Sequence, residues 1–246
     1  MTAPVAAPAL VRLGRVESTQ AVAFALAAGG SPDRTVVIAE AQSAGRGRRG
    51  RTWHDEPGAS LLTSIILRPR LTPARLPMLS LAAGIAVAEA VERVTGLAPR
   101  LKWPNDVLVD GRKLAGILLE SRIGTASLDA GAAPLVVLGI GVNLAQRAFP
   151  AELAERATSV HLATGRTVQA DALLSALLEA LDAWRARLET EGGAPIRERW
   201  RSLADTLGRR VTIDGVSGIA VDVDDDGALI VADGPTRHRV VAGEVA

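Results

Sequence analysis

The chain has no cysteine, and this absence removes several kinds of site. Without thiols there can be no disulfide and no thiolate metal centre, which fits a reducing compartment. The histidines are also few: His54, His161 and His238 are scattered and lack the spacing of zinc ligands. No metal-binding residues can therefore be assigned directly from the sequence.

An excess of charge of either sign is missing too. The 28 basic and 27 acidic side chains leave a net charge of +1, which gives no electrostatic basis for broad binding to nucleic acid or to an anionic membrane. The start of the chain, Met1 to Leu10, lacks the basic segment and apolar run of a signal peptide. The longest apolar stretches, such as Leu79 to Val91, are interrupted and are expected to be too short for a membrane span. We predict a soluble, cytoplasmic protein.

The pattern of apolar residues predicts a large α+β domain followed by a small β domain. Two segments have helical spacing, Leu76–Val94 and Leu173–Leu188. Ser18 or Thr19 can also cap an Ala-rich helix that ends at Gly29-Gly30. Predicted strands of the large domain are Val11–Val16, Thr35–Glu40, Ser60–Leu67, Val107–Val109, Leu114–Glu120 and Leu135–Val142. The segment Gly124 to Pro134 is turn-rich and predicted to be mobile. Short strands with Gly/Asp turns follow, so we place domains at 1–206 and 207–246, the second a small antiparallel barrel.

The most informative segment is Gly45–Trp53, here called the arginine loop, in which four arginines are interleaved with three glycines. Guanidinium groups suit carboxylates and phosphates, and glycine lets the backbone approach a ligand. Gly45, Gly47 and Gly50 have the spacing of a dinucleotide fingerprint, but no helix and no acidic ribose partner follow. A solvated basic turn or an RNA-contacting patch is the alternative. The glycines and Trp53 favour a loop that closes over a small polyanion, with an indole able to stack on adenine.

Polar residues also stand at the ends of later strands. Proline stiffens the turn Lys102–Asp106, from which polar side chains project, although such a pattern is commonly turn chemistry alone. Lys113 enters an apolar run, either as an edge-strand charge or as a cation aimed into a pocket. Asn143 ends the most apolar strand, where ligands bind in many α/β sheets, or it closes a simple turn.

Together these motifs resemble those of the bacterial biotin–protein ligases, over nearly the whole chain. The matching segments are Ser18-Thr19, Gly45-Arg46-Gly47-Arg48-Arg49-Gly50-Arg51-x-Trp53, Lys102-Trp103-Pro104-Asn105-Asp106, Lys113-Leu114-Ala115-Gly116-Ile117-Leu118 and Gly139-x-Gly141-x-Asn143. The resemblance implies an α+β fold: a mixed-sheet catalytic domain of the class II aminoacyl-tRNA synthetase and biotin ligase type, plus a C-terminal SH3-like β barrel. It also implies the monofunctional form, because the chain begins about where the catalytic domain does and leaves no room for an N-terminal DNA-binding domain.

The resemblance further implies the reaction and its partners. Biotin would attack ATP, with Mg²⁺ on the phosphates, to give biotinyl-5′-AMP and pyrophosphate. A lysine of apo biotin carboxyl carrier protein would then displace AMP. No nucleic acid or membrane partner is expected, and both a monomer and a homodimer remain open.

The resemblance assigns roles residue by residue. Lys113 and Arg48 would be catalytic, with Lys113 paired to the biotin carboxylate and later to the acyl phosphate. The implied biotin site comprises Ser18, Thr19, Gln20, Gln42, Gly45, Arg46, Gly47, Arg48, Lys113 and Gly116. The implied ATP and adenylate site comprises Arg48, Arg49, Arg51, Trp53, Lys102, Asn105 and Asn143.

One position departs from the family, and two other functions remain as alternatives. Gln20 stands where the family usually has asparagine, which leaves helix capping by its neighbours intact.

The resemblance also implies a role for the arginine loop. The loop would become ordered over biotinyl-5′-AMP, a mixed anhydride, and exclude water from it. A lipoate ligase or octanoyltransferase shares the implied fold, and a nucleic-acid-binding module could use the arginine loop alone.

Overall fold

The structure is a computed structural model that describes residues 8–122 and 134–245. Within these residues the main sheet has seven strands, in the order β1 (Leu10–Val16), β2 (Val36–Gln42), β3 (Ser60–Leu67), β7 (Leu135–Asn143), β6 (Arg112–Arg122), β5 (Asp106–Val109) and β4 (Arg100–Lys102). β1 and β2 run parallel and the other neighbours run antiparallel, so the sheet is mixed. The segment Gly124 to Pro134, predicted to be mobile, lies outside the described residues except for Pro134.

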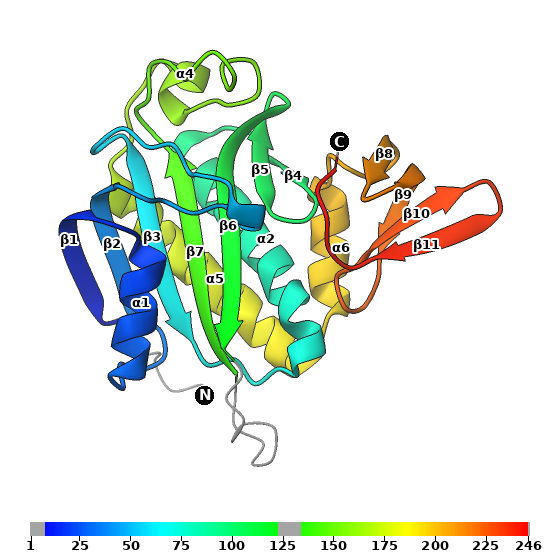
Figure 1. Cartoon of the computed structure of the whole chain (residues 1–246), viewed down its shortest axis with the longest axis horizontal. Coiled ribbons are helices and arrows are strands. Elements are labelled where there is room, and N and C mark those ends of the chain that lie inside the picture. The colour runs from blue at the N-terminus through cyan, green and yellow to red at the C-terminus, as the bar shows by residue number, and fades with distance from the viewer. Residues whose placement is uncertain (1–7, 123–133, 246) are drawn as a thin grey trace.

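Helices cover both faces of this sheet (Figure 1). α1 (Thr19–Ala28) lies on one face, α2 (Leu76–Thr95) and α5 (Ala170–Glu191) lie on the other, and α6 (Ala194–Leu203) packs against both of the latter. Because side chains alternate between the faces of a strand, a central strand contributes to two cores. Ile65 of β3 joins the larger core under α2 and α5, while Ile66 joins the smaller core under α1. β3 is consequently buried along its whole length.

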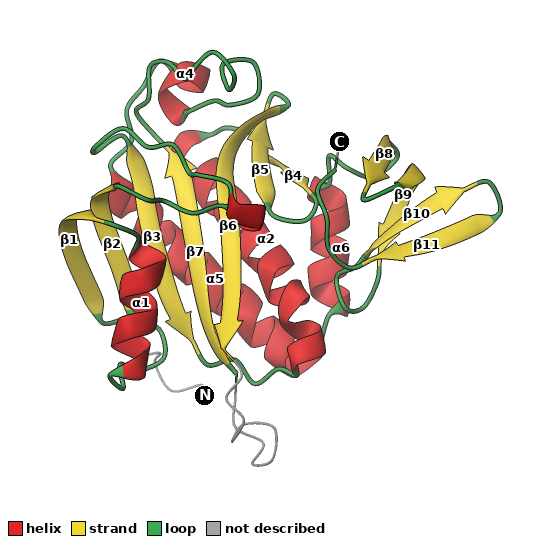
Figure 2. Cartoon of the chain, viewed as in Figure 1, coloured by secondary structure: helices red, strands yellow, loops and turns green. Residues whose placement is uncertain are grey.

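The C-terminal strands form a separate sheet, seen to the right of the main sheet in Figure 2. Its antiparallel order is β11 (Thr236–Val240), β10 (Leu229–Asp233), β9 (Val216–Val223) and β8 (Arg210–Ile213). The predicted α+β class, with a mixed sheet and a distinct C-terminal β unit, is confirmed; the boundary between residues 206 and 207 stays a prediction. Buried Trp103 ties the two sheets together, since its Nε1 donates to the Gly227 carbonyl at 3.0 Å and its amide donates to Thr206 Oγ1 at 2.8 Å.

Two sequence expectations about helices need correction. The structure has helical segments that the pattern did not predict: η1 (Arg48–Gly50), η2 (Pro73–Arg75), α4 (Val160–Thr164) and α6. α6 escaped because only Ile196 and Trp200 are buried along it, too few to make a helical period visible. Ser18 stands at the N-cap of α1, but its side chain makes no capping hydrogen bond. The Thr19 amide at this helix start donates instead to Oε1 of Gln42, at 2.8 Å.

The expectation that no apolar stretch is long enough for a membrane span was also wrong. The helical segment Pro73–Thr95, which contains α2, passes by length and composition alone. However, 72% of its most apolar window is buried inside the molecule. It packs against α5, α6 and the main sheet, so its composition is that of a core helix.

Candidate functional site

A cavity of about 620 Å³ opens on the side of the main sheet that carries α1. Its volume is typical of sites for small molecules and cofactors. Its lining includes every sequence-predicted site residue except Gly45, together with Gly243 and Glu244 from the C-terminal end of the chain. Gly45 is buried at the base of the arginine loop, where its carbonyl accepts a 2.9 Å hydrogen bond from the Trp53 amide. The sequence motifs, spread over more than 120 residues, therefore meet at one place.

The floor of the cavity is made of glycines on the two central strands. Gly116 of β6 and Gly141 of β7 are direct partners across the ladder, and the indole of Trp53 lies on them. A Cβ added at Gly141 would lie 2.7 Å from Cε2 and Cζ2 of that indole, and one at Gly116 would lie 3.1 Å from Cζ3. Only glycine leaves room for a ring this close to the sheet. The indole therefore rests directly on the backbone of the two strands.

A chain of polar side chains closes the end of the cavity beside α1. Oε1 of Gln42 accepts from the Thr19 hydroxyl at 3.1 Å as well as from its amide, and the Thr19 and Ser64 hydroxyls lie 2.8 Å apart. Ser64 donates to Oε1 of Gln20 at 3.0 Å, and Nε2 of Gln20 donates to the Val137 carbonyl at 3.0 Å. This buried cluster can recognise a polar ring by directed hydrogen bonds, and Ser64 belongs to it although no sequence motif contained it.

Gln20 has a second effect, because it limits the space above Gly139. A Cβ at Gly139 would lie 2.6 Å from Oε1 of Gln20. The glutamine side chain is therefore packed between α1 and β7 and joins both elements. Gln20 lines the cavity as the sequence suggested, while its amide is already engaged with Val137 and Ser64.

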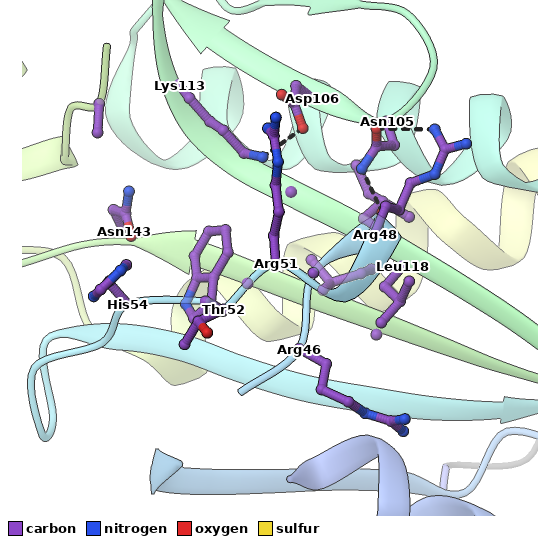
Figure 3. A pocket seen from close by; sticks show the side chains of 18 of the residues that line it. Arg46, Arg48, Arg51, Thr52, His54, Asn105, Asp106, Lys113, Leu118 and Asn143 are labelled. Atoms are coloured by element: carbon purple, nitrogen blue, oxygen red, sulfur yellow. Dashed lines mark hydrogen bonds and ion pairs between the residues drawn. The ribbon is translucent and has the colours of Figure 1, made fainter. Parts of the chain in front are cut away.

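The cationic centre of the cavity is Lys113, on the return strand of the β5–β6 hairpin. Its Nζ lies 2.6 Å from Oδ1 of Asp106 (Figure 3). The same nitrogen lies 5.9 Å from the centre of the Trp53 ring system. The backbone of Lys113 is fixed at both ends, since its amide donates to the Arg156 carbonyl and its carbonyl accepts from the Thr158 amide. Of the two sequence alternatives for Lys113, the structure shows the cation that lines a pocket.

The arginine loop folds back on itself above this floor. The backbones of Arg46 and Thr52 form an isolated antiparallel β-bridge, and the Gly47 amide donates to the Arg51 carbonyl at 2.7 Å. Positive φ angles at Arg49 and Gly50 close the turn between them. No helix follows it, as the sequence predicted, so the glycine spacing is not a dinucleotide fingerprint.

The guanidinium groups of the loop point in different directions. Arg48 donates through Nη1 to Oδ1 of Asn105 at 3.3 Å, and burial lowers its pKa, an effect to which the neighbouring charge of Arg49 adds (Figure 3). Arg46 reaches Glu120 on β6 at 3.3 Å. Arg49 and Arg51 contact carboxylates of the C-terminal unit, Asp214 and Glu244. The loop therefore spans the cavity and touches both parts of the molecule.

Two amide side chains hold the neighbouring loops. Nδ2 of Asn105 donates to the Ile117 carbonyl at 2.8 Å, and Nδ2 of buried Asn143 donates to the Thr158 carbonyl at 3.0 Å. Lys102 lines the cavity and is half-buried. These positions place amide and ammonium groups around the cavity on the side of Lys113.

Matches to protein-family models cover both parts of the chain. Residues 13–143 match the biotin/lipoate A/B protein ligase family, and residues 206–246 match the biotin protein ligase C-terminal domain. The chain belongs to the biotin protein ligase family. This membership confirms the resemblance seen in the sequence motifs and the enzyme class that it implied.

Individual relatives agree with this membership. A biotin–[acetyl-CoA-carboxylase] ligase of Paracoccus denitrificans is 40% identical over 242 residues, which cover 95% of this chain and 98% of the relative. A bifunctional ligase/repressor of Bacillus spizizenii is 35% identical over 88% of this chain and 67% of its own length. Among solved structures, a biotin protein ligase from Aquifex aeolicus in complex with biotin and ATP has a TM-score of 0.83 at 27% identity, over 97% of both chains.

The sequence did not identify several residues that line the cavity. Asp106 belongs to one of the matching motifs, but its ion pair with Lys113 is seen only in the folded side chains, because the hairpin ladder pairs Asp106 with Gly116 and Lys113 with Leu108. Arg156 lines the cavity from the chain after β7, and Glu244 from the C-terminal end. Neither has a local signal, because each is brought to the site by tertiary packing alone.

Proposed function

We propose that this biotin protein ligase activates biotin with ATP as biotinyl-5′-AMP and transfers the biotinyl group to one lysine of a biotin carboxyl carrier protein. The observation that carries the proposal is the single cavity in which the family motifs meet, with a glycine floor, a buried polar end and a cationic centre. The Aquifex aeolicus relative, whose solved structure is a complex with biotin and ATP, supports the choice of substrates.

In the first step, a carboxylate oxygen of biotin attacks the α-phosphorus of ATP, and the bond to the β-phosphate oxygen breaks. Two anions must approach, and negative charge grows on the leaving pyrophosphate. Fixed cations lower such a barrier electrostatically. Lys113 would pair with the biotin carboxylate, Arg48 with the reacting phosphate, and Arg49 and Arg51 with the outer phosphates. No covalent enzyme intermediate is needed.

Recognition of the two substrates divides between the ends of the cavity. Ser18, Thr19 and Gln42 would contact the polar ring of biotin, while Trp53, which lies on the glycine floor, would stack on the adenine ring. Lys102, Asn105 and Asn143 would contact the nucleotide on the side of Lys113. The backbone of Arg46, Gly47 and Arg48 would close over the biotinyl group, as the family motif implies.

In the second step, the neutral ε-amine of the carrier lysine attacks the carbonyl carbon of the mixed anhydride. The bond from that carbon to the phosphate oxygen breaks, AMP leaves, and the amine loses a proton. The arginine loop would cover the anhydride until the carrier arrives, which limits hydrolysis.

Mg²⁺ would enter as a companion of ATP. Among the described residues, no group of three or more histidine or acidic side chains is arranged to hold a metal ion. Mg²⁺ commonly binds nucleotide phosphates with few protein ligands and several waters. The donor set therefore fits an ion held mainly by the phosphates, whose charge it would reduce.

A direct test incubates the protein with radiolabelled biotin, ATP·Mg²⁺ and an apo carrier domain. Label is expected on one carrier lysine and on no other residue of that domain. A carrier variant with arginine at this lysine is the matched control. Absence of label from the wild-type carrier would refute the proposal.

Lipoate is the substrate to exclude, because the family model over residues 13–143 covers biotin and lipoate ligases alike. The match of residues 206–246 to the biotin-specific C-terminal domain favours biotin. In pyrophosphate exchange, biotin should support turnover and lipoate should neither support nor inhibit it. Preferential exchange with lipoate would replace the proposed substrate.

A further inference from the structure

Two carboxylates of the C-terminal unit occupy the arginines that the proposed function assigns to the phosphates of ATP. Arg49 binds Asp214 through both terminal nitrogens, with Nη1 to Oδ1 at 2.9 Å. Arg51 binds Glu244 through Nη1. The partners are 165 and 193 residues apart in sequence, so the contacts link the arginine loop to the far end of the chain.

The chain places these two carboxylates side by side. Asp214 lies at the turn after β8, and Glu244 follows β11 and lines the cavity. Gly243 joins them, since a Cβ there would lie 2.1 Å from Cγ2 of Ile213 and 3.3 Å from Oδ2 of Asp214. Its φ of 146° is one that side-chain-bearing residues rarely adopt. The C-terminal segment is therefore pressed against the β8 turn, and two acidic groups face two basic ones.

The ion pairs Arg49–Asp214 and Arg51–Glu244 are exposed enough for another anion to replace the carboxylates. Half or more of the Arg49 and Arg51 side chains is exposed, as is half of Asp214. Exposed ion pairs contribute little to stability, because water and salt compete with them. A triphosphate offers more charge than a carboxylate and more acceptor oxygens to the same guanidinium forks. Arg48, by contrast, is half-buried and contacts Asn105 within the main domain.

We propose that Asp214 and Glu244 form a latch that holds Arg49 and Arg51 in the unliganded enzyme, and that the triphosphate of ATP displaces both carboxylates when it binds. This proposal rests on the proposed function, which supplies ATP as the ligand. The latch gives the C-terminal unit a positioning role in nucleotide binding: it keeps the arginine loop folded over the cavity while no phosphate is present. Its loss frees Arg49 and Arg51 and removes the contacts of the arginine loop with the C-terminal unit.

The experiment compares wild type with the double variant Asp214→Asn/Glu244→Gln, which preserves shape and removes both charges. Asp226→Asn is the matched control, since Asp226 pairs with Arg239 within the C-terminal unit and does not line the cavity. Trypsin cleaves after arginine, so limited digestion without ligand reports how well the arginine loop is held. The double variant should be cut in this loop at least about fivefold faster than wild type and the control.

Calorimetric titration with ATP·Mg²⁺ gives the second readout. The double variant should bind ATP more tightly than wild type, because no carboxylate then competes with the phosphates for Arg49 and Arg51. The gain should be only about three- to tenfold, because exposed ion pairs are weak. A merely structural role of the ion pairs would leave ATP affinity unchanged or weaken it. Equal cleavage rates, or an ATP affinity that is unchanged or reduced in the double variant, would overturn the latch.

Failure of the latch is distinguishable from failure of the proposed function. Biotin-dependent pyrophosphate exchange by the wild-type enzyme tests the function and does not depend on Asp214 or Glu244. Normal exchange by wild type, together with wild-type cleavage rate and ATP affinity in the double variant, would reject the latch alone. Absence of exchange in wild type would reject the function, while the digestion arm, which contains no nucleotide, still reports on the contact.

Discussion

Nζ of Lys113 and Oδ1 of Asp106 lie 2.6 Å apart at the wall of the cavity, on opposite strands of the β5–β6 hairpin. The carboxylate fixes the position of the ammonium group before a substrate enters. When a substrate carboxylate arrives, the ammonium must be shared with it or surrendered to it. The two side chains should therefore act as a unit in the first chemical step.

Removing the amine should cost far more activity than removing its partner. Lys113→Ala should lower kcat/KM for biotin-dependent pyrophosphate exchange by about 10²- to 10³-fold, the range for loss of one charged group at a developing anion. Asp106→Asn should lower it by about tenfold, because the amine remains but is less well placed. Measured together, the double variant should be no worse than Lys113→Ala. Near-normal exchange by Lys113→Ala would remove it from the catalytic role.

A methyl group on the glycine floor should displace the indole. In Gly141→Ala the new Cβ would lie 2.7 Å from two ring carbons of Trp53, closer than such contacts occur. We expect the Kd for biotin, measured by calorimetry, to rise by about tenfold or more, since overpacking costs about 1–3 kcal/mol. Gly14→Ala is the control, because a Cβ there meets nothing within 4 Å.

A second substitution separates this clash from general unfolding. Trp53→Ala in the Gly141→Ala background removes the ring that is struck. The thermal midpoint lost in Gly141→Ala should be at least partly restored, even though biotin affinity stays low. A double variant less stable than Gly141→Ala would show that the indole is not the group displaced.

The sequence pattern predicted the helices and strands that have many buried residues along their length. β3 matches its prediction to the residue, Ser60–Leu67, because it is a run of apolar and small hydroxyl residues that is buried on both faces. α2 begins where predicted, at Leu76, and ends at Thr95, one residue beyond the predicted end, because Gly96 with its positive φ caps it there. α6 was missed because its surface is polar over most of its length.

Contacts between segments that are distant in the chain could not be predicted from the sequence. The motifs named more than half of the cavity lining, but not that Trp53 lies on Gly116 and Gly141 or that Gln20 fills the space above Gly139. The direction of a side chain is set by what packs against it, and that information lies in other strands. The pairing of Arg49 with Asp214, 165 residues away, has no periodicity or motif that could reveal it.

Gln20 should contribute to stability as well as to the site. Its Nε2 donates to the Val137 carbonyl and its Oε1 accepts from Ser64, both in a buried setting. Gln20→Ala leaves these partners without it, so we expect a loss of about 1–3 kcal/mol in the free energy of unfolding, measured with urea. Gln20→Asn should lose a similar amount, because a side chain one methylene shorter does not reach both partners. Wild-type stability in Gln20→Asn would contradict this.

The C-terminal sheet should lose stability in acid through Asp224. Burial alone would raise the pKa of this carboxyl, but the hydrogen bond from Arg239 and those from the Ala228 and Asp226 amides outweigh it, and the pKa is lowered from the ordinary value of 3.8. A carboxyl with a lowered folded-state pKa stabilises the fold above its unfolded pKa, and this contribution is lost as pH falls through the folded value. Between pH 6 and pH 3, the free energy of unfolding in urea should therefore fall more for wild type than for Asp224→Asn. Asp233→Asn, an exposed position on the same sheet, should follow wild type. Equal acid dependence of wild type and Asp224→Asn would show that this carboxylate does not stabilise the C-terminal unit by its charge.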